Sequence, residues 1–402
     1  MSLPIHRWFR YSAGFSSEWA QTLIQRQMRT GRSHVLDPFA GSGTTTLVGE
    51  QCGVETIGIE AHPFVSRVAQ TKLHWREDPD KFERYAHTLL VRAQAIRPDV
   101  DGYAPLIQRC FPPHILARLD TLRRVWASQA DGSPVSQLSW LALAAILREC
   151  SPAGTATWQY VLPKKEKARI ADPYQAFAAK VRLMSCDMSA RQQLAVGPQA
   201  RLYADDARVC AEVPDGWADL IITSPPYVNN YDYADATRLE MTFFQEIQGW
   251  GDLQKAVRDH LIPSCTQQVG RLVKHTGELI SDPALATIHV ELAETCQQLE
   301  VERTQHGGKK NYHTMIAAYF GNMAKALKTM RRVTRTGALV CLVIGDSAPY
   351  GVHVPVERWL GELALTSGFA AYHFEKARDR NTKWKNRKHR VPLHEGYLWI
   401  EG

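Results

Sequence analysis

Short apolar runs alternate with amphipathic stretches along most of the chain. Runs bounded by glycine, proline or acidic residues are typical of buried parallel strands, and they occupy 34–37, 56–59, 200–204, 219–222 and 337–344. Apolar residues at helical spacing predict helices over 17–28, 81–95, 114–129, 135–150 and 356–367. The long stretches 62–188 and 239–327 are also predicted to be mostly helical. The segments 369–374 and 395–400 alternate and predict an antiparallel pair. The pattern therefore predicts an α/β fold with a doubly wound, mostly parallel sheet, a closing antiparallel hairpin and helical insertions.

One predicted strand ends in a rigid, proline-rich loop. Asp219 leads into an apolar run, and Thr-Ser-Pro-Pro-Tyr at 223–227 then stops the strand. Two prolines fix φ and remove two N–H donors, and strand carboxyl ends are where open α/β sheets bind ligands. The hydroxyl of Ser224 and the carbonyl of Pro225 suit the two hydrogens of an exocyclic amine, while Tyr227 offers a face for a planar base. The plain alternative is a Pro-Pro turn closed by a core tyrosine.

A glycine loop follows the first predicted strand. Gly41 and Gly43 allow a ligand to approach the backbone closely, and a helix to about residue 52 follows them. A nucleotide P-loop is not expected, because no Walker lysine follows and the spacing is not GxGxxG. Glu60 closes the next strand, where an acidic residue commonly binds a ribose diol, although it is also consistent with a surface carboxylate. Asp206 follows the strand at 200–204 and, like Asp205, is also suited to capping the next turn.

Taken together, these segments resemble the amino-methylating (N4-cytosine/N6-adenine) S-adenosylmethionine-dependent DNA methyltransferases, with the cofactor motif first. TSPPY resembles the catalytic motif, in which an initial Ser goes mostly with cytosine, and DPFAGSGTT with Glu60 resembles the cofactor motif. The resemblance implies methyl transfer from S-adenosyl-L-methionine to the N4 amine of a flipped cytosine. The implied catalytic residues are Ser224, Pro225, Pro226 and Tyr227. The implied cofactor-binding residues are Phe15, Asp37, Pro38, Phe39, Ala40, Gly41, Ser42, Gly43, Thr44, Glu60 and Asp206.

The motifs also suggest a domain organisation. A catalytic domain is expected over 1–75 and 200–402, with the cofactor motif at 35–60 and the catalytic motif at 219–227. A helical insertion over 76–199 is a candidate for target recognition or DNA contact. A second helical insertion is expected over 241–312, and its basic, glycine-bearing end at 303–310 is a candidate for ordering on a phosphate backbone.

Charge favours a polyanionic partner. The 402 residues carry a net charge of +7 with a pI near 8.9, and double-stranded DNA is the partner that the resemblance implies. Cations are concentrated between the last two predicted strands, where Asp379 is the only acid and mutual repulsion calls for an anion. A solvated loop is the alternative. The candidate nucleic-acid contacts are Lys376, Arg378, Arg380, Lys383, Lys385, Arg387 and Lys388.

Cysteine spacing and the lengths of the apolar runs indicate the cellular compartment. Eight cysteines lack a CxxC pair or metal-ligand spacing, so free thiols and no metal are expected in a reducing cytoplasm, with nucleoid association. No apolar run reaches transmembrane length, and no signal-peptide core is present at the start of the sequence. A cognate restriction endonuclease or other defence-system subunits are further candidate partners.

Three alternatives to N4-cytosine methylation of DNA are open. Adenine-N6 methylation of DNA and amine methylation of RNA would use the same loop. A catalytically silent nucleic-acid-binding protein would retain only the fold. C5-cytosine chemistry is disfavoured, because it requires a cysteine nucleophile after proline and the sequence has no Pro-Cys pair.

Overall fold

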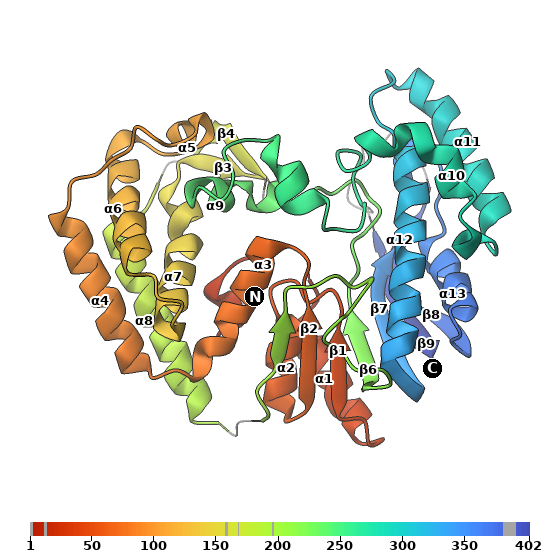
Figure 1. Cartoon of the computed structure of the whole chain (residues 1–402), viewed down its shortest axis with the longest axis horizontal. Coiled ribbons are helices and arrows are strands. Elements are labelled where there is room, and N and C mark those ends of the chain that lie inside the picture. The colour runs from red at the N-terminus through yellow and green to blue at the C-terminus, as the bar shows by residue number, and fades with distance from the viewer. Residues whose placement is uncertain (1–2, 12–13, 157–159, 168, 195–196, 381–390) are drawn as a thin grey trace.

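A seven-stranded sheet runs through the middle of the molecule, with a helical lobe on one side (Figure 1). The computed structural model describes residues 3–11, 14–156, 160–167, 169–194, 197–380 and 391–402. The strand order is β5-β2-β1-β6-β7-β9-β8. Strands β5, β2, β1, β6 and β7 are parallel, and β9 runs antiparallel between β7 and β8. The α/β fold class predicted from the sequence is confirmed.

The elements have the following bounds. The sheet consists of β1 (His34–Asp37), β2 (Glu55–Ile59), β5 (Arg201–Tyr203), β6 (Ala218–Thr223), β7 (Thr334–Gly345), β8 (Ala371–Arg380) and β9 (Leu393–Glu401). A separate pair is formed by β3 (Ala153–Thr155) and β4 (Val161–Glu166). The helices are α1 (Ser17–Met28), α2 (Thr44–Cys52), α3 (Pro63–Lys72), α4 (Pro79–Ala95), α5 (Pro105–Cys110), α6 (Pro113–Gln129), α7 (Pro134–Cys150), α8 (Pro173–Gln192), α9 (Arg238–Phe243), α10 (Thr276–Ile280), α11 (His289–Gln305), α12 (Tyr312–Val333) and α13 (Val356–Thr366).

Both faces of the sheet are covered, which explains the continuous apolar runs. Successive strand residues point to opposite faces. In β6, Leu220 and Ile222 pack with α1 and α2, whereas Ile221 packs with α12 and α13. Val35 and Leu36 of β1 divide in the same way. The sheet is thus a middle layer between two helical layers, and its carboxyl edge is where the loops gather.

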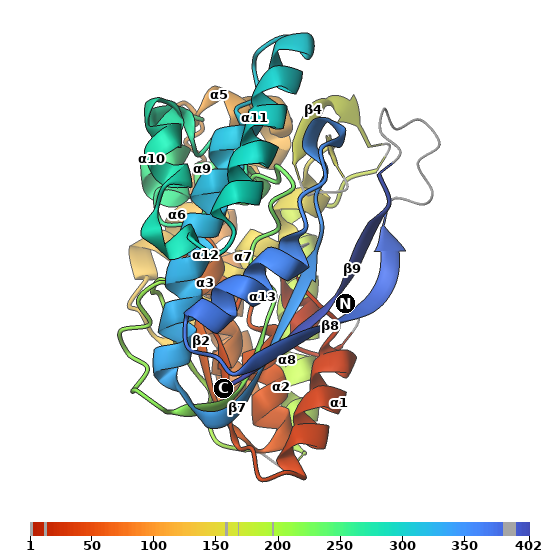
Figure 2. The same ribbon diagram turned by 90° about the vertical axis from the view of Figure 1, so that its right-hand side faces the viewer.

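The hairpin of β8 and β9 extends along one edge of this sheet (Figure 2). Helix α1 lies against it, because Trp19 stacks on Tyr397 with ring centroids 4.8 Å apart. The predicted helix over 17–28 is confirmed, with the Ser16 hydroxyl capping it through the Trp19 N–H. The predicted antiparallel pair is also confirmed, although its strands are longer than the alternating segments.

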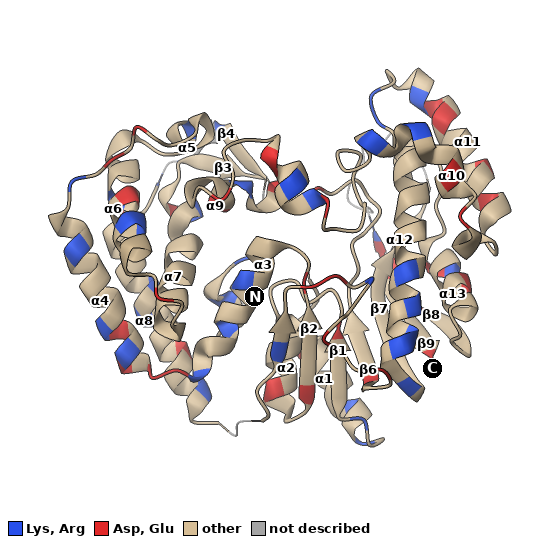
Figure 3. Cartoon of the chain, in the orientation of Figure 1, with Lys and Arg blue, Asp and Glu red and all other residues tan. Residues whose placement is uncertain are grey.

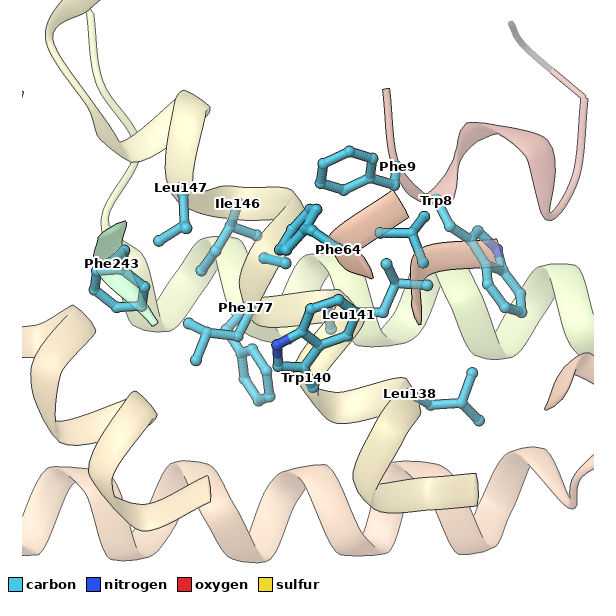
Figure 4. Close-up of a cluster of buried hydrophobic side chains, with 14 of the residues drawn as sticks. Trp8, Phe9, Phe64, Leu138, Trp140, Leu141, Ile146, Leu147, Phe177 and Phe243 are labelled. Atoms are coloured by element: carbon cyan, nitrogen blue, oxygen red, sulfur yellow. The ribbon is translucent and has the colours of Figure 1, made fainter. Parts of the chain in front are cut away.

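The helical lobe has its own apolar core (Figure 4). Helices α4, α6, α7 and α8 pack around it, and the fully buried Trp140 lies near its centre. The amino-terminal segment contributes Trp8 and Phe9, and α3 contributes Phe64. This core therefore connects the start of the chain to the 79–192 region, and it reaches the edge of the sheet at Leu202 of β5.

Two parts of the predicted helical stretches are not helical. The pair β3–β4 lies within the 62–188 stretch, which was predicted to be mostly helical. Its sequence is hard to interpret because Pro163 and the Lys164–Lys167 charge run mask a two-stranded ribbon, where an edge proline is tolerated. Between α9 and α10 the chain forms short turns, including a π-helical turn at Gln254–Arg258. Gly249, Gly251 and Pro263 interrupt the helix there.

Charged side chains of both signs are distributed over the helices, and the cysteines are unpaired. Lys and Arg are spread over the helical lobe, α12 and the α11–α12 connection, and acids lie among them (Figure 3). All eight cysteines are free thiols, as predicted. None of the helices in the described part of the chain combines the length and apolarity that crossing a bilayer requires.

Candidate active site

A cavity of about 840 Å³ opens at the carboxyl edge of the parallel strands. It joins the glycine loop after β1, the end of β2, the loop after β6 and the end of β7. The predicted catalytic and cofactor-binding residues that line it are Phe15, Asp37, Pro38, Phe39, Ala40, Gly41, Ser42, Thr44, Glu60, Asp206, Ser224, Pro226 and Tyr227. Two of the predicted nucleic-acid contacts, Arg378 and Arg380, also line it. Two segments separated by about 180 residues therefore face one space. Gly43 and Pro225 are not among the lining residues: Gly43 caps α2, and Pro225 is buried.

Glu60 holds the glycine loop from the end of β2. Its Oε2 accepts the Gly41 N–H at 2.7 Å and its Oε1 accepts the His62 N–H at 2.7 Å. Gly41 and Gly43 both have positive φ, 53° and 86°, which favours glycine. Burial raises the pKa of Glu60 to about 7, while the two backbone N–H donors oppose the shift. Each carboxylate oxygen keeps a lone pair for a ligand hydroxyl.

Asp37 connects the two motifs through the protein interior. Its Oδ2 accepts the Thr45 hydroxyl and its Oδ1 accepts the Thr223 hydroxyl, both at 2.6 Å. The Phe39 N–H donates to the same Oδ1 at 3.1 Å. Burial raises the pKa of Asp37 to about 6, and these hydrogen bonds oppose the shift. Since Thr223 directly precedes Ser224, Asp37 fixes the start of the proline loop relative to α2. These bonds favour a positioning role for Asp37.

The neighbouring strand β7 determines which hydrogen bonds the Ser224 hydroxyl can donate and accept. Ser224 Oγ donates its one hydrogen to the Val343 carbonyl of β7 at 3.1 Å. The oxygen is consequently left to accept hydrogen bonds from any further group. No hydrogen bond within the described residues ends on the Pro225 carbonyl. The Tyr227 side chain is hydrogen-bonded to Ser224 as well, so the loop offers the remaining lone pair of the Ser224 oxygen and the Pro225 carbonyl as acceptors.

Tyr227 is a neutral, half-buried ring on the wall of the cavity. Burial raises its pKa well above the ordinary value, and the Glu395 carboxylate adds to the shift. The Tyr227 N–H donates to the Tyr233 hydroxyl at 3.2 Å, which fixes the end of the loop. The Arg380 guanidinium lies over the ring, 5.4 Å from its centroid. One face of Tyr227 is therefore covered by a cation.

The loop after Tyr227 forms an aromatic wall that reaches the helical lobe. Tyr231 packs against Tyr233 edge-on and stacks on Tyr160, with centroids 4.5 and 5.5 Å away. The Tyr160 hydroxyl accepts the Asp232 N–H at 2.8 Å. Asp232 also forms a buried ion pair with Arg258 at 2.6 Å. This loop is therefore anchored to Tyr160, which precedes β4, and to Arg258 of the π-helical turn.

The two aspartates after β5 differ in position. Asp206 lines the cavity and forms an ion pair with Arg208, whose guanidinium also donates to Asn322 and the His260 carbonyl. Asp205 accepts the N–H groups of Asp206 and Ala211, which is a turn-capping role. The choice of Asp206 over Asp205 as the cavity-facing acid agrees with this geometry.

The basic hairpin is only partly described. Lys383, Lys385, Arg387 and Lys388 lie outside the described residues. Arg378 pairs with Glu395 at 2.9 Å and Lys376 pairs with Asp379 at 2.6 Å. Arg380 donates to the Asp346 carbonyl at 2.8 Å. Acids or carbonyls of the protein thus face the three described cations, and Lys376 and Arg378 remain largely exposed, so their contact with a phosphate backbone stays a prediction.

Several residues at the cavity were not predicted from the sequence. Lys72 is 1 % exposed, and its Nζ donates to the carbonyls of Ser42 at 3.1 Å and His6 at 3.4 Å. Burial lowers the pKa of Lys72 to about 7, and no salt bridge between described residues includes it. Lys72 thus ties the glycine loop to the amino-terminal segment. Only its place at the end of an amphipathic helix was a signal. The other lining residues that were missed include Tyr11, Tyr160, His260, Tyr312, Met315 and Asp346.

Comparison with known proteins gives a consistent picture. A family model described as DNA methylase matches residues 5–71, from the amino-terminal segment through most of α3. Type II methyltransferase M.AvaI of Nostoc sp. is 24% identical over 92% of this chain and 80% of its own length. Type II methyltransferase M.BsoBI of Geobacillus stearothermophilus is 25% identical over 91% and 78%. Type II methyltransferase M.MjaII of Methanocaldococcus jannaschii is 32% identical over 69 residues, 17% of this chain and 13% of its own. The first two likenesses extend well beyond the cofactor and catalytic motifs.

Proposed function

We propose that this chain methylates the N4 amine of a cytosine flipped out of double-stranded DNA. The chain belongs to the amino-methylating DNA methyltransferase family and uses S-adenosylmethionine. The observation that carries the proposal is the single cavity shared by the glycine loop and Ser224. The likeness to Type II methyltransferases supports a place as the modification component of a restriction-modification system.

The residues at one end of the cavity fit the cofactor. Glu60 retains acceptor capacity for a ribose diol, and Asp206 is a second acid at the neighbouring strand end. Positive φ at Gly41 leaves backbone open to close approach, and the half-buried Phe15 supplies an apolar side. When bound, S-adenosylmethionine supplies a methyl group that its sulfonium already activates.

The loop after β6 would bind and orient the target amine. The Ser224 oxygen and the Pro225 carbonyl accept the two N4 hydrogens, which directs the nitrogen lone pair towards the cofactor end of the cavity. As positive charge develops on N4, both acceptors stabilise it, and a charged partner strengthens such hydrogen bonds. The carbonyl of Val343 keeps the Ser224 hydrogen turned away from the amine. The rate then derives mainly from proximity and orientation.

Tyr227 would hold the flipped base by stacking. Arg380 covers one face of the ring, so the base is assigned to the other. Tyr231, Tyr233 and Tyr160 line the same space and restrict how far the base can move. Base stacking on an aromatic side chain contributes about 1–3 kcal/mol.

The test is product identification. The purified protein is incubated with plasmid DNA and methyl-labelled S-adenosylmethionine, and the DNA is digested to nucleosides. Label in N4-methylcytosine supports the proposal, and label in N6-methyladenine refutes the assignment of the base. Cofactor binding without labelled DNA, combined with labelled structured RNA, refutes the assignment of the substrate.

A further inference from the structure

A cluster of two acids and two histidines lies beside the cavity and has no part in the reaction above. Asp346 follows β7, His353 lies in the next loop, Glu357 is in the first turn of α13 and His394 begins β9. His394 Nδ1 and His353 Nε2 approach the same Asp346 Oδ2 at 3.0 and 3.1 Å. His394 Nε2 lies 3.6 Å from Glu357 Oε1. Three chain segments thus converge on one point.

The spacing of these groups suits an ion. One donor atom from each of Asp346, Glu357 and His394 lies within 4.8 Å of the other two. Donors bound to one ion at about 2.1 Å can lie up to about 4.2 Å apart, so only small side-chain movements are required. His353 lies outside this three-residue group but contacts Asp346 Oδ2; it is 41% exposed, gives an ion a path to enter and becomes a fourth donor if its ring moves closer.

The cluster is incomplete without a further partner. Asp346 is 1% exposed, yet its Oδ1 has no hydrogen-bond partner within the described residues, and the same is true of Glu357 Oε2. Leaving a buried carboxylate oxygen unpaired is costly, and the neighbouring cations do not remove the deficit. Arg358 pairs with Glu291 and Glu362 instead, and Arg380 reaches the Asp346 carbonyl rather than its carboxylate.

We infer that Asp346, His353, Glu357 and His394 form a binding site for a first-row divalent transition-metal ion of the Zn²⁺ or Mn²⁺ class. Two carboxylates and two neutral imidazoles balance the charge of a dication. Imidazole ligands favour these ions over Mg²⁺ and Ca²⁺, which prefer oxygen donors only. The ion would join β7, α13 and the start of β9. Because Arg380 is held by Asp346 and lies over Tyr227, the ion would also stiffen the wall of the cavity.

The experiment uses the full chain without a histidine tag. Metal content is measured by mass spectrometry after desalting, and Co²⁺ is titrated into chelator-treated protein while its visible absorption is recorded. The inference predicts about one metal ion per chain, cobalt bands typical of mixed nitrogen and oxygen ligands, and a Tm that falls after chelation and returns with Zn²⁺.

Matched variants locate the ion. His394→Asn and Glu357→Gln should each weaken metal binding by more than about 10-fold. His373→Asn, on the neighbouring strand, and Glu362→Gln, one and a half turns along α13, should retain it. If His394→Asn does not fold, Glu357→Gln and the wild type decide the question. The inference is overturned if the wild type binds no stoichiometric ion, or if both cluster variants bind it as the wild type does; a hydrogen-bonded His-Asp-His network is then the correct description.

Discussion

Replacing Ser224 by alanine separates positioning of the target amine from cofactor binding. The side chain lies at the catalytic end of the cavity, and its hydroxyl donates to Val343 at 3.1 Å. The substitution removes one of the two acceptors proposed for the target amine and leaves Glu60 and the glycine loop unchanged. We therefore expect cofactor affinity to be retained while turnover falls.

The size of the effect follows from the bond that is lost. A hydrogen bond to a group that becomes charged is worth about 1.5–3 kcal/mol. Because about 1.4 kcal/mol corresponds to a factor of ten in rate, kcat should fall about 10- to 150-fold. The Val343 carbonyl also loses its donor, which should lower the free energy of unfolding by about 0.5–1.5 kcal/mol.

Single-turnover methyl transfer at saturating DNA measures the rate, and calorimetric titration measures cofactor affinity. Ser347→Ala is the matched control, since Ser347 Oγ likewise donates to a backbone carbonyl, that of Val228, at 2.7 Å. It should lose similar stability with a much smaller change in rate. Unchanged turnover in Ser224→Ala would refute the role of the hydroxyl, as would an equal loss of rate in both variants.

Three further predictions concern the supports of the cavity. The pKa of Glu60 is raised from 4.5 to about 7, so the stability that its protonated form contributes is present below pH 4.5 and is lost as pH rises through 7. In urea melts, the free energy of unfolding of Glu60→Gln should therefore rise by up to about 3 kcal/mol relative to that of the wild type between pH 5 and 8. A difference between the two proteins that does not change with pH would contradict this. Thr223→Val removes a donor from the buried Asp37 and should lower the free energy of unfolding by about 1–3 kcal/mol, whereas an unshifted urea midpoint would argue against the clamp. Arg380→Gln should raise the KM for DNA, because Tyr227 loses the guanidinium that covers its ring, while the salt dependence of DNA binding stays the same. If the slope of log binding constant against log salt concentration instead becomes shallower by about 0.9, Arg380 is a phosphate contact.

The sheet and the motif loops were predictable because their signals are local. Buried parallel strands produce continuous apolar runs, and Gly41 with Gly43 or Pro225 with Pro226 marks where such a strand must stop. The fold class and the positions of the main strands follow from these signals. The carboxyl-edge rule for open sheets then brings residue 41 and residue 224 together without any contact information.

The rest depends on contacts between distant parts of the chain. No local pattern indicates that Tyr160 would accept a hydrogen bond from Asp232, or that Lys72 would be buried under Ser42. The β3–β4 ribbon was missed because its second strand carries a charge run that also suits a solvated helix or loop. The basic segment before β9 was interpreted from composition alone, which cannot reveal the internal acids that pair with its described cations.

The most direct test of the central claim is the methylation map of DNA from cells. The chain, and separately its Ser224→Ala variant, would be expressed in a methylation-deficient bacterial host, and the DNA analysed by single-molecule sequencing. The account predicts N4-methylcytosine at one recurring sequence with the wild type and a lower modified fraction at that sequence with the variant. N6-methyladenine at such a sequence, or equal cytosine modification by both proteins, would contradict it.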